Sequence, residues 1–236
     1  MRESGIAAWG GRAIEFSVLR SDRKTISITV SPEGDVLVRV PHSAELEEVA
    51  ERVSKRGGWV TYHQSRAEAW RPRTPPRTYE LGETHLYLGR QYRLSAEIGL
   101  AQSVKPIGDR LSLTMHRPNR VEDRKILIEA WYLTEARRIF SQRLDAVFGP
   151  FAQMGHSRPP LIIRDLTHRW GSLTARGNLV MSRHVVRAPR QCIDYVLVHE
   201  LCHLEHQNHG AEFWNLLDRM MPDHRRRKAK LETILL

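Results

Sequence analysis

The stretch His199–Trp214, HELCHLEHQNHGAEFW, decides how this 236-residue chain is interpreted. It opens with the pattern HExxH. On an α-helix this spacing places His199 and His203 one turn apart on one face, so that both imidazoles can reach one metal ion. Glu200 then lies beside the metal, where it can take a proton from a bound water. The pattern therefore predicts a catalytic zinc site on a helix.

The same stretch offers two candidates for a third metal ligand. His206 lies three residues after His203, on the same face if the helix continues. His209 lies six residues after His203, so the chain has to turn before this side chain can converge. Asn208 and Gly210 permit such a turn, and the geometry favours His209. Three protein ligands would leave a fourth position for water, as in catalytic zinc sites, although another divalent metal could occupy the site.

The sequence before this stretch predicts an α+β fold that begins with a β-rich part. The segment Tyr195–Val198 is apolar and would bury the histidine helix, so that unpaired polar side chains there would be costly without a metal. The N-terminal part alternates as strands do and then becomes helical after Pro41, with Ser43 as the expected helix cap. Strands are predicted over 14–19, 25–30 and 36–40, and helices from 44 and over 59–70, with a break at Gly57–Gly58.

The proline-rich run 71–77 is the clearest linker in the sequence. Beyond it the pattern predicts strands over 85–88, 92–94, 110–115, 161–166 and 179–182, a helix over 121–148, a tight bend over 169–174, a helix from Pro189 through the motif to about 208, and a helix over 213–221. We therefore expect an N-terminal part of strands plus helix (1–70), the linker (71–77) and a catalytic part (78–236). One continuous domain over 1–236 is the alternative.

The net charge of +10 and the pI near 10.1 favour association with polyanions such as nucleic acid or nucleotides. The two cysteines, Cys192 and Cys202, make no disulfide framework, which is typical of a reducing compartment. No apolar run approaches the roughly 20 residues that span a bilayer. The first residues, 1–12, lack the features of a signal peptide. The sequence therefore predicts a cytoplasmic protein that does not enter a membrane.

The motif stretch resembles the HELxHLxxxNHxxxFW block of the YgjP-like metallopeptidase family, a zincin group. Arg169–Ser172 resembles the RWGSC segment of that family, and the strand beginning at Arg23 resembles its opening. The resemblance implies a zincin-like catalytic part in which His199, His203 and His209 bind the metal and Glu200 is the general base. The chain departs from the pattern at Leu173, where the family often has cysteine.

Two further residues are candidates for contact with substrate or transition state. Arg169 could stabilise an oxyanion, with Trp170 beside it, but both could equally belong to a structural bend. We expect a zinc-dependent hydrolase, most simply a metallopeptidase. The alternatives are a metal-dependent nucleoside triphosphate pyrophosphatase, because arginines could hold the phosphates, and a nucleic-acid-binding module with structural zinc, which would need four protein ligands and no Glu200.

Overall fold

The computed structural model describes residues 3–31, 34–69, 77–166 and 169–235, with the side chains of 66–69 left aside. The chain divides into two compact units, Met1–Thr74 and Pro75–Leu235. Of the predicted linker 71–77, only Arg77 falls within the described residues. None of the described helices combines the length and apolar character that a membrane-spanning segment needs.

The N-terminal unit is a four-stranded sheet with two helices. Its elements are β1 (Glu3–Trp9), β2 (Arg12–Arg20), β3 (Ser27–Val30), β4 (Val36–Val40), α1 (Leu46–Lys55) and α2 (Gly57–Ala69). The strand order is β1-β2-β4-β3, with β2 and β4 parallel and the other pairs antiparallel. Alternate residues such as Phe16 and Val38 form a core with Val49 and Val53 of α1.

Two details of this unit differ from the prediction. Strand β1 was not predicted, because its sequence (ESGIAAW) contains glycine and alanine, which are weak strand formers. The predicted cap at Ser43 is wrong: α1 begins at Leu46 after Glu45, with no side-chain hydrogen bond to its first turn. A break between two helices is confirmed, but it lies at Arg56, and Gly57 and Gly58 already belong to α2.

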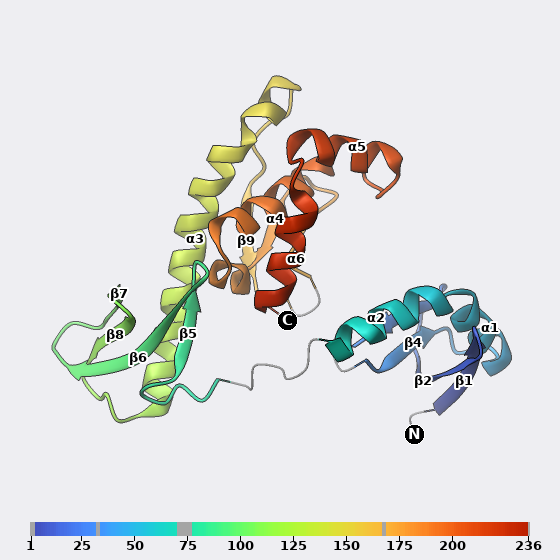
Figure 1. The fold of residues 1–236 in the computed structure, drawn as a ribbon, viewed down its shortest axis with the longest axis horizontal. Coiled ribbons are helices and arrows are strands. Elements are labelled where there is room, and N and C mark those ends of the chain that lie inside the picture. The colour runs from blue at the N-terminus through green and yellow to red at the C-terminus, as the bar shows by residue number, and fades with distance from the viewer. Residues whose placement is uncertain (1–2, 32–33, 70–76, 167–168, 236) are drawn as a thin grey trace. The chain divides into compact units, whose positions relative to one another are not determined.

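The C-terminal unit contains two sheets and the longest helix. Its elements are β5 (Thr84–Tyr87), β6 (Arg90–Ile98), β7 (Ser103–Ile107), β8 (Arg110–Met115), α3 (Val121–Gln153), β9 (Leu161–Arg164), β10 (Gly171–Leu173), β11 (Leu179–Ser182), the 3-10 helix η1 (Arg183–Arg187), α4 (Arg190–Cys202), α5 (Ala211–Met220) and α6 (His224–Leu235). The sheet orders are β5-β6-β8-β7 and β10-β11-β9. Figure 1 shows the first sheet beside the start of α3. Helix α5 lies at the opposite end of the unit.

This arrangement confirms the predicted α+β class and corrects several boundaries. Strand β7 was missed because it contains Pro106, which cannot donate to a sheet; β7 lies at the sheet edge, where proline is tolerated. The predicted bend over 169–174 is wrong, because Gly171–Leu173 forms β10 and pairs with β11. The helix predicted to run to about 208 ends at Cys202.

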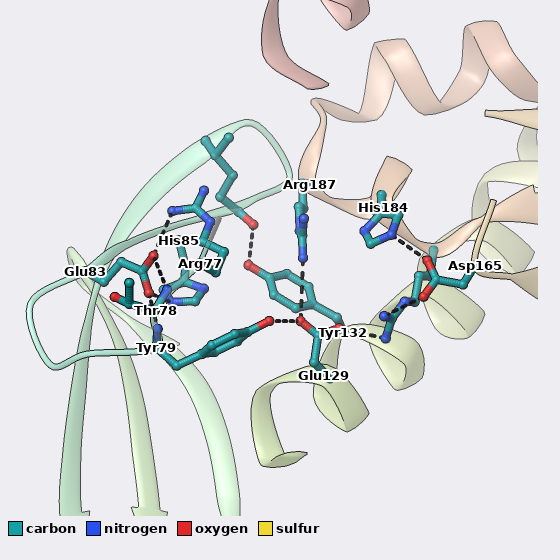
Figure 2. Close-up of polar contacts among 12 residues, drawn as sticks. Arg77, Thr78, Tyr79, Glu83, His85, Glu129, Tyr132, Asp165, His184 and Arg187 are labelled. Atoms are coloured by element: carbon teal, nitrogen blue, oxygen red, sulfur yellow. Dashed lines mark hydrogen bonds and ion pairs between the residues drawn. The ribbon is translucent and has the colours of Figure 1, made fainter. Parts of the chain in front are cut away.

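A cluster of polar side chains joins the first sheet, α3 and η1 (Figure 2). Glu129 of α3 accepts a hydrogen bond from the Tyr79 hydroxyl and pairs with Arg183 (2.7 Å) and Arg187 (3.7 Å). The Arg187 guanidinium carbon also lies 4.9 Å from the centre of the Tyr132 ring. Paired and partly buried, these charges hold η1 against α3. Because only Ala188 and Pro189 separate η1 from α4, this cluster lies close to the start of that helix.

Candidate metal centre

Helix α4 carries the HExxH pattern and lies within the main core of the C-terminal unit. Every residue from Cys192 to Val198 is buried. Pro189 precedes the first turn, a position where its fixed φ and missing N–H cost nothing. Apart from Asp194 this buried run is apolar, and it places the end of the helix, with His199 and Glu200, at the border of the core. The buried location of α4 therefore follows directly from its sequence.

The chain turns immediately after the second histidine of the pattern. His203 is the residue at the end of α4, and the N–H groups of Glu205 and His206 both bond to the Cys202 carbonyl (3.2 and 3.1 Å). The turn thus comes about five residues earlier than Asn208, where the sequence predicted it. It reverses the chain over 203–210 and returns His209 to the end of α4.

The structure brings His199, His203 and His209 together. One ring nitrogen from each lies within 4.8 Å of the others, and the Nε2 atoms of His199 and His209 are 3.0 Å apart. The His203 Nδ1–H donates to the His206 carbonyl (2.9 Å), which leaves the His203 Nε2 lone pair free. The other candidate, His206, is outside the cluster, and its Nδ1 lies 3.6 Å from a Glu212 carboxylate oxygen.

These three histidines have the chemistry that a zinc ion requires. Burial, followed by the nearby His209 and His203, lowers the pKa of His199 to about 3. Burial is also the main cause that lowers the pKa of His209. Both rings are therefore neutral at pH 7, the form that binds metal. Tetrahedral zinc with bonds of about 2.05 Å would hold its nitrogens about 3.3 Å apart, close to the separation of His199 and His209. The donor set therefore fits such an ion.

Glu200 lies beside this cluster in an apolar environment. Its burial raises the pKa of the carboxyl group to about 7, opposed by a hydrogen bond from the Leu173 backbone and by the charge of Arg169. Strand β10 passes very close: a β-carbon on Gly171 would lie 2.9 Å from the Glu200 Cγ and 3.1 Å from Val196 Cγ1. A carboxylate with a pKa near the working pH is suited to accept and return a proton.

The structure places Arg169 and Trp170 differently from each other. Arg169 is exposed, and its charge lowers the pKa of Glu200, so it lies within electrostatic range of that carboxylate. Trp170 is partly buried, packs against the main core, and accepts a hydrogen bond from the Ser182 N–H through its carbonyl. The geometry thus favours a core role for Trp170 and keeps Arg169 as a candidate for substrate contact.

Several residues at the centre are not among the predicted site residues. Phe213 is fully buried, with its ring centre 4.5 to 5.0 Å from those of the three histidines. Trp214, His224 and Lys228 also surround the cluster: Trp214 contacts His209, and the charge of Lys228 lowers the pKa of both His199 and His209. The apolar pair Phe-Trp was a usable signal. The two α6 residues had none, because their approach depends on helix packing.

The cysteines and Tyr195 stand apart from the cluster. Cys192 and Cys202 are free and buried, and neither belongs to the group of converging ligand atoms. Tyr195 is buried, and this burial raises its pKa. Its ring lies 5.8 Å from that of His199, which makes it a packing neighbour of the first histidine.

An α+β fold in which three histidines converge next to a buried glutamate is the arrangement found in metal-dependent hydrolases. Comparison with protein families places it further: the model of the YgjP-like metallopeptidase domain matches residues 24–234. The chain therefore belongs to the YgjP-like metallopeptidase family. Among solved structures it is similar to the metallopeptidase zymogen jannalysin of Methanocaldococcus jannaschii, at 20% identity and a TM-score of 0.34, over 43% of this chain and 97% of that one. Comparison with curated proteins gives no match.

Proposed function

We propose that the chain is a zinc-dependent peptidase in which His199, His203 and His209 hold the metal and Glu200 is the general base. The observation that carries this proposal is the convergence of three imidazoles, two of them (His199 and His209) with lowered pKa values, next to a buried carboxyl group with a pKa of about 7. Membership in a metallopeptidase family supports the reaction class. A zinc ion bound there would polarise the scissile carbonyl and increase the acidity of water.

In the proposed reaction Glu200 accepts the proton from water and later donates it. The Leu173 N–H holds its carboxylate, while burial keeps its pKa near neutrality. In the ionised form Glu200 accepts a proton from the attacking water, and in the protonated form it delivers that proton to the departing amine. Arg169 lies on the exposed side, where its charge favours the ionised form and could also attract a substrate carbonyl or carboxylate.

The edge of β10 supports an extended peptide as the substrate. The Trp170 carbonyl and the Thr174 N–H bond toward the β11 side. Because backbone groups alternate along a strand, those of Gly171 and Leu173 face the other side, where the Leu173 N–H meets Glu200. Among the described strands, β10 is an edge strand of its sheet. A peptide could pair with this edge and bring a carbonyl to the metal centre.

The nucleotide and nucleic-acid alternatives have less support. Two residues of the basic run on α6 already form ion pairs, since Arg226 and Arg227 both bind Asp223 at 2.8 Å. The family finding points to peptides rather than nucleotides or nucleic acid. Cys192 and Cys202 are free, which is typical of proteins in a reducing compartment, so we also propose a cytoplasmic location.

Replacement of Glu200 by glutamine tests this function. We expect Glu200→Gln to retain one zinc per chain, because the ligands are unchanged, and to lose about 100-fold or more of the peptide-hydrolysing activity. Zinc content is measured by elemental analysis, and activity by the release of new amino groups from an unfolded protein and from mixed peptides. Nucleoside triphosphates are assayed in parallel.

Glu135→Gln is the matched control. Glu135 is a partly buried glutamate of α3 that pairs with Arg138, and we expect its replacement to leave both activity and zinc content unchanged. Full peptide hydrolysis by Glu200→Gln would refute the general-base role. Hydrolysis of nucleoside triphosphates without any hydrolysis of peptides would overturn the peptidase proposal.

A further inference from the structure

His209 is the ligand that most needs support from outside its own backbone. His199 lies within α4 and His203 at its end, so the helix orients both side chains. His209 instead lies in the irregular segment between α4 and α5 and is exposed. A ligand on an exposed loop loses conformational freedom when it binds metal. Any group that already restrains it would strengthen metal binding.

Trp214 provides such a restraint on the backbone of His209. Its indole N–H donates a hydrogen bond to the His209 carbonyl at 3.1 Å. Its ring centre lies 5.8 Å from that of His209 and 6.5 Å from that of His199. The indole is held on the first turns of α5, which begins at Ala211. One side chain thus fixes both the carbonyl and one flank of the third histidine.

Trp214 is in turn held by His224, the first residue of α6. The two rings are stacked, with centres 6.0 Å apart and an angle of 26° between their planes. His224 is only 2% exposed, and its Nε2 lies 2.8 Å from an Asp218 carboxylate oxygen. Asp218 follows Trp214 by one turn of α5, so His224 contacts two successive turns of that helix.

The burial of His224 is not explained by packing alone. An imidazole that is almost fully buried loses hydration at both nitrogens, yet its Nδ1 has no hydrogen-bond partner in the part of the chain that the structure describes. An apolar ring would fill the same space without this cost. The Asp218 contact orients the imidazole ring so that its face lies against Trp214.

We propose that Trp214 and His224 are positioning residues for the metal centre: His224, oriented by Asp218, holds the Trp214 indole, and the indole N–H holds His209. The inference rests on the proposed function, because it takes His209 as a metal ligand. It adds a role for two residues outside the HExxH pattern. The measurable consequence is metal affinity, separate from the stability of the metal-free fold.

The test compares the zinc affinity of the full chain with that of two variants. Trp214→Phe keeps an aromatic ring but removes the N–H donor, and His224→Ala removes the stacked ring. We expect each to raise the zinc dissociation constant about 10-fold or more, measured by competition with a chromophoric chelator. The visible absorption spectrum of the cobalt-substituted protein should shift in both variants, because the geometry of one ligand changes. Thermal unfolding of the metal-free proteins measures stability separately.

Two variants serve as matched controls. Trp59→Phe replaces a tryptophan of similar exposure (40%, against 37% for Trp214) in the N-terminal unit. His184→Asn breaks another histidine–aspartate pair, at 2.6 Å from Asp165. Both should bind zinc as the original protein does.

A double variant separates this inference from the proposed function. If Trp214 acts through His209, then Trp214→Phe should cause no further loss of zinc affinity in a His209→Ala background. If His209→Ala itself binds zinc with full affinity, the proposed ligand set is wrong. If His209→Ala weakens binding but Trp214→Phe binds zinc like the original protein, only the positioning role is refuted, whether or not His224→Ala folds.

Discussion

Gly171 lies where a larger residue would displace the Glu200 side chain. The contact is a matter of space rather than of backbone conformation, because a β-carbon at Gly171 would meet Glu200 Cγ at 2.9 Å and Oε1 at 3.1 Å. Val196 closes the other side at 3.1 Å. The glycine of the Arg-Trp-Gly-Ser segment therefore allows β10 to approach α4 closely. This approach brings the Leu173 N–H to the Glu200 carboxylate.

The close approach of β10 to α4 leaves no room for a side chain at position 171. We expect Gly171→Ala to push the Glu200 carboxylate away from its place and lower peptide hydrolysis by about 10- to 100-fold, while zinc content is retained. Activity and zinc content are measured on the same preparation. Gly149→Ala is the control, since no heavy atom lies within 4 Å of its β-carbon position apart from its chain neighbours and the backbone of its own helix. Equal activities of the two variants would contradict our account of Gly171.

Helix α4 is anchored by a charged side chain on its buried side. Both carboxylate oxygens of Asp194 accept hydrogen bonds from Arg143 of α3, at 2.7 Å each. Arg227 of α6 lies 3.8 Å from the same carboxylate. Asp194 thus connects three helices little more than one turn before His199. Bidentate geometry fixes direction as well as distance, so this contact sets the rotation of α4 about its axis.

The contacts of Asp194 with α3 and α6 should contribute to the stability of the folded chain. Asp194→Asn should lower the free energy of unfolding by about 2–3 kcal/mol, because the partly buried guanidinium groups of Arg143 and Arg227 lose their counter-charge. Chemical denaturation of the metal-free protein measures the change. Asp145→Asn breaks a more exposed pair with Arg158 and should cost less than about 1 kcal/mol. Similar losses in both variants would show that the Asp194 contact has no special weight.

The two units have separate hydrophobic cores. The N-terminal core is formed by residues such as Val38, Val49 and Val60. The core of the C-terminal unit contains the apolar residues of α4 and also Phe213, which lies at the candidate metal centre. The described residues of each core belong to one unit only, in line with the two compact units of the chain.

The C-terminal unit should fold and bind metal without the N-terminal unit. We expect a fragment of residues 77–235 to fold and to bind zinc with a dissociation constant within about twofold of that of the full chain, because every residue of the candidate centre lies inside it. Zinc titration and thermal unfolding of the fragment and the full chain provide the comparison. An unfolded fragment, or a zinc affinity 10-fold weaker, would favour one continuous domain over 1–236.

Much of the fold and of the centre could be predicted from local patterns. The strand at 36–40 and the start of the long helix at Val121 agree with the structure, because residue alternation and helical periodicity are properties of neighbouring residues. The HExxH spacing selected His199, Glu200 and His203, and the structure brings the two histidines together with His209. The choice between His206 and His209 depended on a turn that the composition of the segment allowed.

Other features depend on residues that are distant in sequence, and only the tertiary structure revealed them. The end of α4 at Cys202 depends on the reversal of the chain after the second histidine. The contact between Gly171 and Glu200 requires a strand and a helix to pack, and the stacking of His224 on Trp214 requires α5 and α6 to do so. Spacing within a helix specifies which side chains share a face. The pKa of Glu200 and the support of His209 come from the surfaces against which those faces pack, and the free energy of that packing belongs to the folded chain as a whole.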